Sequence, residues 1–537
     1  MKLQLLWALP TMALLAFASC SNDDTIQGNN EQLTEETTGM TEFAVEESPR
    51  LGKAATRTMG IYNGSAIDFY WTAGDTLWIN SGSGTSPLIK NSKNNISGKT
   101  ATAKFYFTGT YTAESYPVRY TGNGKTVGDK VTIKSKQEQK DANDGSHIGT
   151  DGDCGTATAT KDGGRYRFTL SHKASYITFI PYYSHGFADA VKVTQIKVTA
   201  DEALAGEFSF NDNGIDLASR PSANPSNQSI TLNLNGDGLN GFPVPTEPKI
   251  DKNAAIMVLA PGIYNNFTVE YTLHDSETLV TGTVTKNYGT LTFREGKNKR
   301  VAADLGVPHY SSDIYYMWDA AVNQHAWKGH EDYQPILNGQ ANLNHYPKNA
   351  SDPRWYNPLS FPASAARSAK DCPNANELRW YAEKGTPHWD PSIWCIMKHL
   401  YQGGMWLKKR SVIAAENHKS PADLKQSAPD GTNFTATSSN PKLYEKFEYD
   451  NKTITLGKPD ILSNYIFLPV FGYYLTGHYS GKDLKPSELR FIGQRGYYWS
   501  STPRPDMNLN GYNIYVARDR VHTGYGDRQN AHCLWPE

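Results

Sequence analysis

The sequence predicts a mainly β protein with two antiparallel β-sandwiches in tandem, followed by a domain of α+β structure. Short apolar runs alternate with turn residues, and the chain contains 32 Tyr and 45 Gly. Between residues 41 and 305 the apolar residues repeat with a period of two, and no sustained helical periodicity interrupts them. After residue 305 the composition changes, because nine of the twelve tryptophans lie there.

The first residues have the pattern of an exported lipoprotein. Lys2 precedes an apolar run from Leu3 to Phe17, and two small residues then lead to Cys20. A transmembrane helix is the alternative, but it needs ~20 apolar residues and this run is shorter and contains Pro10. We therefore expect residues 1–20 to be a signal peptide and Cys20 to carry a lipid in the outer membrane.

Residues 21–40 are expected to be an acidic linker. From Ser21 to Glu47 there are eight acidic residues and no basic one. A segment of this composition cannot bury enough apolar surface to fold, so we expect a solvated spacer. Asp23 and Asp24 resemble the export tag of Bacteroidetes lipoproteins, which implies display on the cell surface.

A basic stretch separates two strand-like segments after this linker. Residues 41–47 alternate like a strand, and Arg50, Lys53 and Arg57 follow before the alternation resumes. An exposed linker with arginines is where a trypsin-like protease cuts. We expect processing after Arg57, which directly precedes the resumed strand, with Arg50 as the other position.

Charge and motifs exclude several functions. The net charge is −1 and the pI is about 6.9, which gives no reason to expect a nucleic-acid partner. The chain lacks G-x-S-x-G, P-loop and H-E-x-x-H motifs. A G-x-G-x-x-G string at residues 236–241 precedes proline-rich FPVPTEP, where no helix can start. We therefore expect no catalytic residue, no metal site, no cofactor and no enzymatic activity.

The segment RTMGIYNGSAIDFYWTAGDTLWIN, with its W-x-x-G-D turn at Trp71, Gly74 and Asp75, resembles the opening of a fimbrillin-type domain from Bacteroidetes pili. Later runs at 167–183, 193–210, 254–273 and 289–305 agree with it, and the resemblance covers about residues 41 to 305. It implies transthyretin-like sandwiches. We expect the first at 41–165 and the second at 166–305.

Residues 306–537 combine predicted helices with strands. Asn374 to Gly385 has an Asn start, Glu377 as in a capping box, and a Gly stop. Ser392 to Gly404 has a Ser start and a Gly stop, with an apolar stripe that predicts a second helix; the stripe consists of Ile393, Met397 and Leu400. The runs at 467–481, 496–503 and 511–536 are typical of strands.

This region resembles C-type-lectin-like domains of the Fibrobacter major paralogous type. The segments that carry the resemblance are AARSAKDCPNANELRWY, GGMWLKKR, FLPVFGYY and GYYWSST. The calcium-lectin signatures E-P-N, Q-P-D and W-N-D are absent, so no calcium-dependent sugar site is expected.

Four cysteines remain besides Cys20, and they permit three full pairings. The lectin-like resemblance implies a disulfide between Cys372 and Cys533. Cys395 is the rival partner of Cys533, and Cys154 is expected to be unpaired. Free buried thiols are the alternative.

A contact surface is expected near the end of the chain. Aromatic rings before an Asn- and Asp-rich loop at 503–513 can stack on sugar rings beside amide hydrogen-bonding groups. The candidate ligand-binding residues are Tyr498, Trp499, Asp506, Asn508 and Asn510. For Trp499 itself a place in the core is favoured, and the loop after it is the expected contact surface.

The fimbrillin resemblance implies a pilus subunit. The second sandwich runs on into the third domain instead of ending in a strand that could be donated, so we expect a tip subunit whose third domain is an adhesive head. Proteolysis would remove the first strand with its lipid, and a strand from another pilus subunit would fill the groove. The third domain would face a glycan or a host or bacterial surface receptor. The alternative is a permanently lipidated outer-membrane protein that binds glycans or anchors the pilus. Formylglycine-generating enzymes share the lectin-like fold, but no activated thiol environment is visible.

Overall fold

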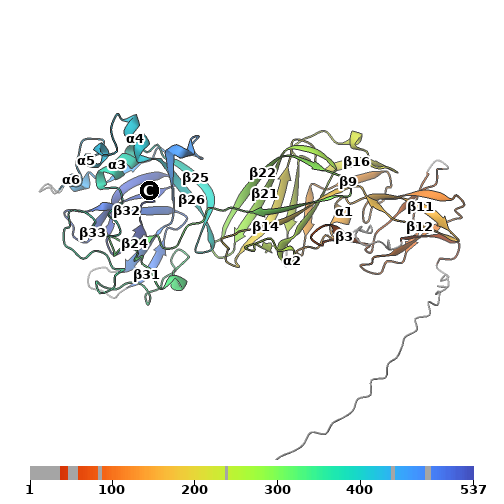
Figure 1. Cartoon of the computed structure of the whole chain (residues 1–537), viewed down its shortest axis with the longest axis horizontal. Coiled ribbons are helices and arrows are strands. Elements are labelled where there is room, and N and C mark those ends of the chain that lie inside the picture. The colour runs from red at the N-terminus through yellow and green to blue at the C-terminus, as the bar shows by residue number, and fades with distance from the viewer. Residues whose placement is uncertain are drawn as a thin grey trace, which may run out of the picture.

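The computed structural model describes residues 37–45, 59–82, 87–235, 240–436, 442–477 and 485–536. The expected signal peptide, Cys20, Arg50 and Arg57 lie outside these residues, as does most of the acidic linker. Within the described ranges, no helix is long and apolar enough to cross a membrane. The chain forms three bodies in a row, with the first sheet at one end and the tryptophan-rich domain at the other (Figure 1).

The mainly β class is confirmed; the transthyretin-like and lectin-like assignments remain predictions. The first domain is built on one sheet in the order β5-β4-β8-β11-β12-β1-β7-β6, with β13 paired to β11. Its strands are β1 (Met40–Val45), β4 (Trp78–Asn80), β5 (Leu88–Lys90), β6 (Lys93–Asn94), β7 (Ala103–Thr108), β8 (Ser115–Tyr120), β11 (Gly155–Asp162), β12 (Arg165–Phe168) and β13 (Ser171–His172).

The second domain contains a larger sheet in the order β10-β18-β15-β21-β22, with β19 paired to β15, and smaller sheets β20-β14-β23, β17-β16-β9 and β2-β3. Its elements are β2 (Met59–Tyr62), β3 (Ile67–Tyr70), β9 (Lys130–Ile133), β10 (Lys136–Gln139), α1 (Ile148–Asp151), β14 (Ser175–Tyr182), β15 (Val191–Thr199), β16 (Gly206–Asn211), β17 (Gly214–Ile215), β18 (Ser229–Leu234), β19 (Phe242–Pro243), α2 (Ile250–Asn253), β20 (Ala255–Leu259), β21 (Gly262–Asp275), β22 (Val280–Phe293) and β23 (Asn298–Asp304).

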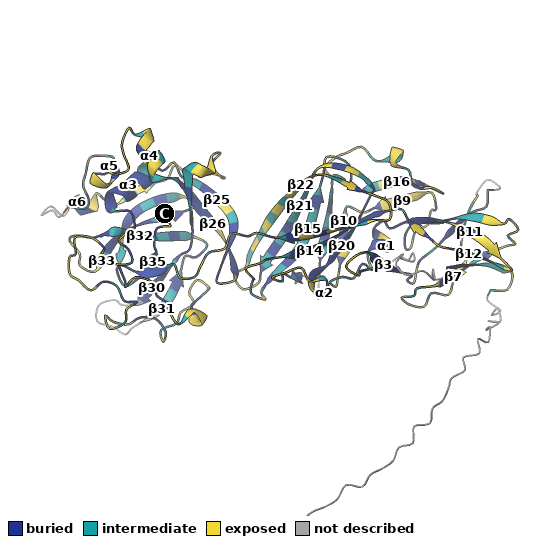
Figure 2. Cartoon of the chain, in the orientation of Figure 1, coloured by how far each residue is buried: buried dark blue, intermediate teal, exposed yellow. Residues whose placement is uncertain are grey.

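The period-two alternation places the core of this domain as expected. Phe267, Val269, Tyr271 and Leu273 on β21 are all buried, while the residues between them are partly exposed. Tyr271 contacts Phe179 of β14, with ring centroids 6.2 Å apart, so the two sheets pack face to face. Figure 2 shows buried segments in dark blue along the strands of the second domain.

The structure moves the boundary expected between residues 165 and 166. β12 begins at Arg165 but belongs to the first sheet, while β2, β3, β9 and β10 join the second domain. Phe69 lies in the second core and Trp71 in the first, so the chain crosses between the domains there. One cut in the sequence therefore cannot separate the two domains.

The third domain contains sheets β27-β34-β33-β32-β35-β30-β31, with β24 paired to β35, and β28-β25-β26-β29. Its elements are β24 (Tyr315–Met317), α3 (Ala375–Lys384), β25 (His388–Ile396), β26 (His399–Lys408), α4 (Arg410–Glu416), α5 (Asp423–Gln426), α6 (Lys442–Glu445), β27 (Tyr449–Asn451), β28 (Thr455–Leu456), β29 (Tyr465–Pro469), β30 (Tyr473–Gly477), β31 (Lys485–Arg490), β32 (Arg495–Pro503), β33 (Asn510–Ala517), β34 (Arg520–Asp527) and β35 (Ala531–Cys533).

The first predicted helix of this domain is confirmed and the second is wrong. α3 begins after Asn374, which forms the expected capping box with Glu377. Residues 392–404 instead form most of the β25–β26 hairpin. Its turn residues, Met397 and Lys398, have φ angles of 52° and 66°, as a two-residue hairpin turn requires. Pairing of β26 with β29 overrides the helical spacing of the apolar stripe.

Candidate functional site

The leading strand β1 lies inside the first sheet, between two neighbours. It pairs antiparallel with β7 and parallel with β12. Phe43 is fully buried between them, opposite Phe105 on one side and Tyr166 on the other. Removing β1 would therefore open a groove with an unpaired strand edge on each side.

The expected processing segment starts directly after this strand. β1 ends at Val45, Arg50 and Arg57 lie in the segment outside the described residues, and the chain resumes at Met59 in β2. β2 is held by the second domain, because the backbone N–H of Tyr62 donates to Oδ1 of Asn143 at 2.8 Å. A cut in the intervening segment would leave β1 and β2 in separate bodies.

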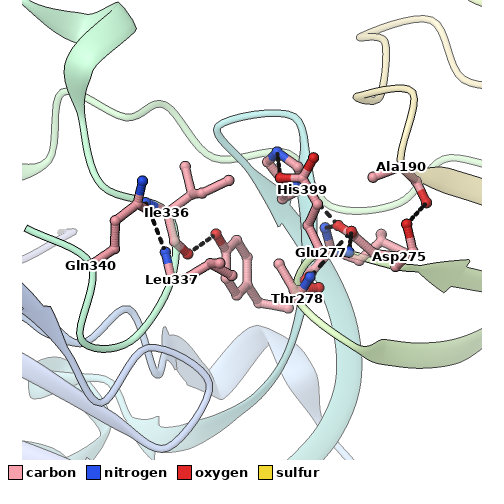
Figure 3. Close-up of polar contacts among 11 residues, drawn as sticks. Ala190, Asp275, Glu277, Thr278, Ile336, Leu337, Gln340 and His399 are labelled. Carbon is pink, nitrogen blue, oxygen red and sulfur yellow. Dashed lines mark hydrogen bonds and ion pairs between the residues drawn. The ribbon is translucent and has the colours of Figure 1, made fainter.

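The third domain is fixed to the second by a buried polar contact, shown in Figure 3. The carboxylate of Asp275, at the end of β21, accepts hydrogen bonds at 3.0 Å from Nδ1 of His399 and from the backbone N–H of Leu400. Burial raises the pKa of Asp275, but the hydrogen bonds from His399, Leu400 and Glu277 outweigh it, and the pKa is about 2. The carboxylate therefore stays ionised at neutral pH.

Apolar packing surrounds that contact. Ile393, Cys395 and Leu400 of the third domain belong to the same buried cluster as the second domain. Ile393 packs directly on Gly282 of β22. A Cβ atom added to Gly282 would lie only 2.1 Å from Cγ2 of Ile393. The second and third domains thus share a core and form a continuous unit.

Two of the five candidate ligand residues are not available at the surface. Tyr498 and Trp499 are 1% and 0% exposed, because both faces of the central strand β32 are covered. The Tyr498 hydroxyl donates to the carbonyl of Pro469 at 2.7 Å, and Nε1 of Trp499 donates to Tyr316 at 2.8 Å. The expected stacking platform is therefore wrong, and Trp499 is a core residue.

The other three candidates lie at the loop between β32 and β33. Asp506 and Asn508 are exposed, and the Asp506 carboxylate accepts a hydrogen bond from Nε of Arg504 at 2.8 Å. Nδ2 of Asn510 donates to Oδ1 of Asp527 at 2.9 Å. β33, which starts at the end of this loop, lies in the part of the third domain remote from the first sheet (Figure 1). The loop is thus held in shape by its own polar side chains.

Buried Arg528 connects this loop to a second loop, which contains Leu359. Arg528 is fully buried, and its guanidinium donates to the carbonyl oxygens of Leu359 at 3.1 Å and Asn510 at 3.2 Å. It also lies 4.4 Å from the ring centroid of Trp318. Burial lowers the pKa of Arg528 to about 10, so the group stays cationic at neutral pH. We call it the Arg528 clamp.

The two clamped loops and the adjoining strand β34 expose apolar side chains, which sequence reasoning missed. We call this set the loop patch; its members are Leu359, Phe361, Met507, Leu509 and Tyr525, each between 42% and 60% exposed. Phe361 has a φ of 50°, a left-handed conformation that costs a bulky residue ~1 kcal/mol or more. A pocket of about 90 Å³ beside Leu509 is lined also by Tyr356, Asp527 and Gln529. The signal in the sequence is NPLSFP at 357–362, where apolar residues sit between prolines and cannot join a sheet.

The exposed apolar side chains make this patch a candidate contact surface. Contiguous exposed apolar area on a rigid support marks binding surfaces in soluble proteins. The Arg528 clamp fixes both loops before any partner arrives, which lowers the entropic cost of binding.

The expected disulfide is not formed. Cys154, Cys372, Cys395 and Cys533 are all free and buried in the described structure. The Cys372 thiol lies beside the backbone of Trp535 instead of being bonded to Cys533. Burial raises the pKa of Cys372 and of Cys395 to about 12, which makes both poor nucleophiles.

Within the described ranges, no group of three or more His, Cys, Asp or Glu side chains is placed to hold a metal ion.

No family model and no curated protein matches this sequence. Among solved structures, a "putative cell adhesion protein" from Bacteroides ovatus ATCC 8483 is 14% identical, covers 50% of this chain and 94% of its own, and gives a TM-score of 0.30. One from Bacteroides uniformis ATCC 8492 is 13% identical, with 50% and 94% coverage and a TM-score of 0.28. A fimbrial protein from B. ovatus ATCC 8483 is 12% identical and covers 92% of this chain and 98% of its own. Its TM-score is 0.23. At these TM-scores the function must be argued from this chain's own residues.

Proposed function

We propose that this protein is a cell-surface pilus tip subunit and adhesin. It is made as a precursor lipidated on Cys20 in the outer membrane, and it is cut after Arg57 or Arg50. The cut releases β1, and a strand from a neighbouring pilus subunit takes its place.

The position of β1 is the observation that carries this proposal. A strand with two neighbours leaves two rows of unpaired N–H and C=O groups when it is lost, and a replacement strand can satisfy both rows. The segment with both arginines follows β1 directly, and β2 beyond it is held by a different domain. The arrangement suits a strand that is cut off and exchanged.

The third domain supports a terminal place in the pilus. A stalk subunit must also donate a strand to its neighbour. Here β23 leads directly into the third domain, with Leu305 and Val307 buried, and the Tyr183 hydroxyl donates to the carbonyl of Val307 at 3.2 Å. The end of the second domain is therefore not a free extension that could be donated.

The loop patch supports the adhesive role. The third domain, which carries the patch, shares a core with the second domain. A pulling force on a bound receptor would therefore pass through a continuous folded body. The receptor is a glycan or a protein of a host or bacterial surface, bound by an apolar surface with amide and carboxylate groups at its edge.

The N-terminus of the mature protein on the cell surface tests the proposal. Sequencing by mass spectrometry should find Thr58 or Leu51 as the first residue, and an Arg50→Gln, Arg57→Gln double variant should stay unprocessed and outside the pilus. A lipidated Cys20 on the mature protein would contradict processing. It would favour the permanently lipidated glycan-binding or pilus-anchor protein instead.

A further inference from the structure

We propose that the groove occupied by β1 is selective and takes strands with an aromatic residue at the Phe43 position directly preceded by an acidic residue at the Glu42 position. The proposal deepens the strand exchange above and rests on it. The occupant is a segment of a partner subunit with this side-chain pattern.

An aromatic box receives Phe43. The ring stacks on Tyr166, with centroids 4.6 Å apart and planes within 9°. It meets the edges of Phe107 at 5.0 Å, Tyr111 at 5.6 Å and Tyr116 at 6.3 Å. Stacked and edge-to-face contacts of this kind need a flat ring, so an aliphatic side chain would leave part of the box empty.

Two walls of the box, Tyr166 and Tyr116, also make hydrogen bonds that do not involve β1. The Tyr166 hydroxyl donates to the carbonyl of Ala113 at 2.6 Å. The Tyr116 hydroxyl accepts from the backbone N–H groups of Thr112 at 3.2 Å and Ala113 at 3.1 Å. These two rings keep their hydrogen bonds when the strand leaves, so the stacking partner of Phe43 and one edge contact are available to the next occupant.

Two cations contact Glu42, the residue directly before Phe43. Oε2 of Glu42 lies 3.7 Å from Nζ of Lys104 on β7, and Oε1 lies 3.6 Å from a guanidinium nitrogen of Arg165 on β12. The Glu42 side chain is 17% exposed. Ion pairs at such positions add little affinity, but they reject like charge and so select partners. A lysine at the Glu42 position would face both cations.

Together the two positions fix the register of the incoming strand. Successive side chains of a strand point to opposite faces, so a slip of one residue would turn the carboxylate into the aromatic box and the ring toward Lys104 and Arg165. The adjacent acid and aromatic residue therefore specify one alignment. Main-chain hydrogen bonds alone would permit several.

Synthetic peptides test this on the unprocessed chain without its expected signal peptide, residues 21–537. Trypsin cuts the chain after Arg50 or Arg57, and the N-terminal fragment that contains β1 is removed in mild urea. A fluorescent peptide of residues 37–47 is then added. We expect Phe43→Ala in the peptide to weaken binding ~100-fold or more. Glu42→Lys should weaken it ~10-fold. Glu47→Lys is the matched control, with the same charge change outside β1, and should leave the affinity within ~2-fold.

A charge exchange gives the second arm. In the Lys104→Glu, Arg165→Glu protein the Glu42→Lys peptide should bind better than the unchanged peptide, which reverses the preference. Equal affinity of all peptides for the unmodified groove would overturn the selectivity and leave strand exchange intact. Failure of the unchanged peptide to enter the emptied groove at all would overturn strand exchange itself.

Discussion

The carboxylate of Asp275 on β21 lies 3.0 Å from Nδ1 of His399 on β26, and this contact joins two domains that are consecutive in the chain. Both residues are buried, and neighbouring side chains add hydrogen bonds, such as that from Oγ1 of Thr278 to the carbonyl of Leu400 at 2.8 Å. The third domain is thus carried in a fixed orientation on the second.

Loss of this carboxylate should loosen the joint. Asp275→Ala would leave the ring of His399 and the N–H of Leu400 without their acceptor, at a cost of about 3 kcal/mol. We expect faster proteolysis between residues 304 and 315 in native conditions, read by mass spectrometry. Ser276→Ala, at the next position, is the control and should match the unmodified protein; equal rates for both variants would contradict the role of Asp275.

Acidification should weaken the same joint only at low pH. The pKa of Asp275 is about 2 in the folded chain, below the ordinary value of ~3.9. A depressed carboxyl pKa gives stability that is complete above the ordinary value and is lost as pH falls toward 2. Small-angle scattering should show the second and third domains joined at pH 5 and loosened at pH 2.5. Asp275→Asn should remove this difference between the two pH values. Separation of the domains already at pH 5 would contradict this assignment.

A buried histidine should make the third domain sensitive to mild acid. His532 is 2% exposed, stacks on Trp499 with ring centroids 3.9 Å apart and lies beside Tyr473 and Tyr497. Burial lowers its pKa to about 3. Between that value and the ordinary ~6.5, the unfolded chain binds a proton that the folded chain does not, so stability falls as pH falls, by up to ~1.4 kcal/mol per pH unit.

Urea unfolding at pH 7 and pH 5, followed by tryptophan fluorescence, checks this, because nine of the twelve tryptophans lie after residue 305. We expect a loss of about 2 kcal/mol, much reduced in His532→Phe and His532→Gln. Exposed His418 supplies the control His418→Gln, which should keep the full loss. An unchanged pH dependence in the His532 variants would refute the assignment.

Charged substitutions in the loop patch should abolish adhesion without unfolding the domain. Leu509 and Phe361 are 57% exposed, so Leu509→Asp and Phe361→Asp remove apolar contact area while the Arg528 clamp stays intact. We expect at least ~10-fold fewer pilus-bearing cells attached to a receptor surface and an unchanged melting temperature. The matched control is Leu456→Asp, at a 69% exposed apolar residue outside the patch; equal loss from that variant would show that the patch is not the contact surface.

The cysteines should titrate as four free thiols. Cys154, Cys372, Cys395 and Cys533 are buried, and burial raises the pKa of each thiol. We expect the chain from residue 21, without reductant, to react slowly with a thiol reagent when folded and to release four equivalents in urea. Addition of a reductant should not change its melting temperature. Fewer than four equivalents in urea would reveal a disulfide.

The features that the sequence determined are those encoded by residues close together in the chain. The capping box between Asn374 and Glu377 fixes the start of α3, because both partners lie within one helical turn. The alternation at Phe267, Val269 and Tyr271 fixes the buried face of β21 in the same way. The leading strand, expected at residues 41–47 and found at Met40–Val45, was predicted for the same reason.

Only the tertiary structure decided where those elements pair. Residues 392–404 have helical spacing, yet they form part of a hairpin because β29 pairs with β26, and the β25–β26 turn is fixed when the carbonyl of Lys398 accepts from the N–H of Ala188. The central place of β1, the burial of Trp499 and the Arg528 clamp all depend on partners tens to hundreds of residues away. Contacts over such separations leave no periodicity in the sequence, so the groove and the loop patch became visible only once the chain was folded.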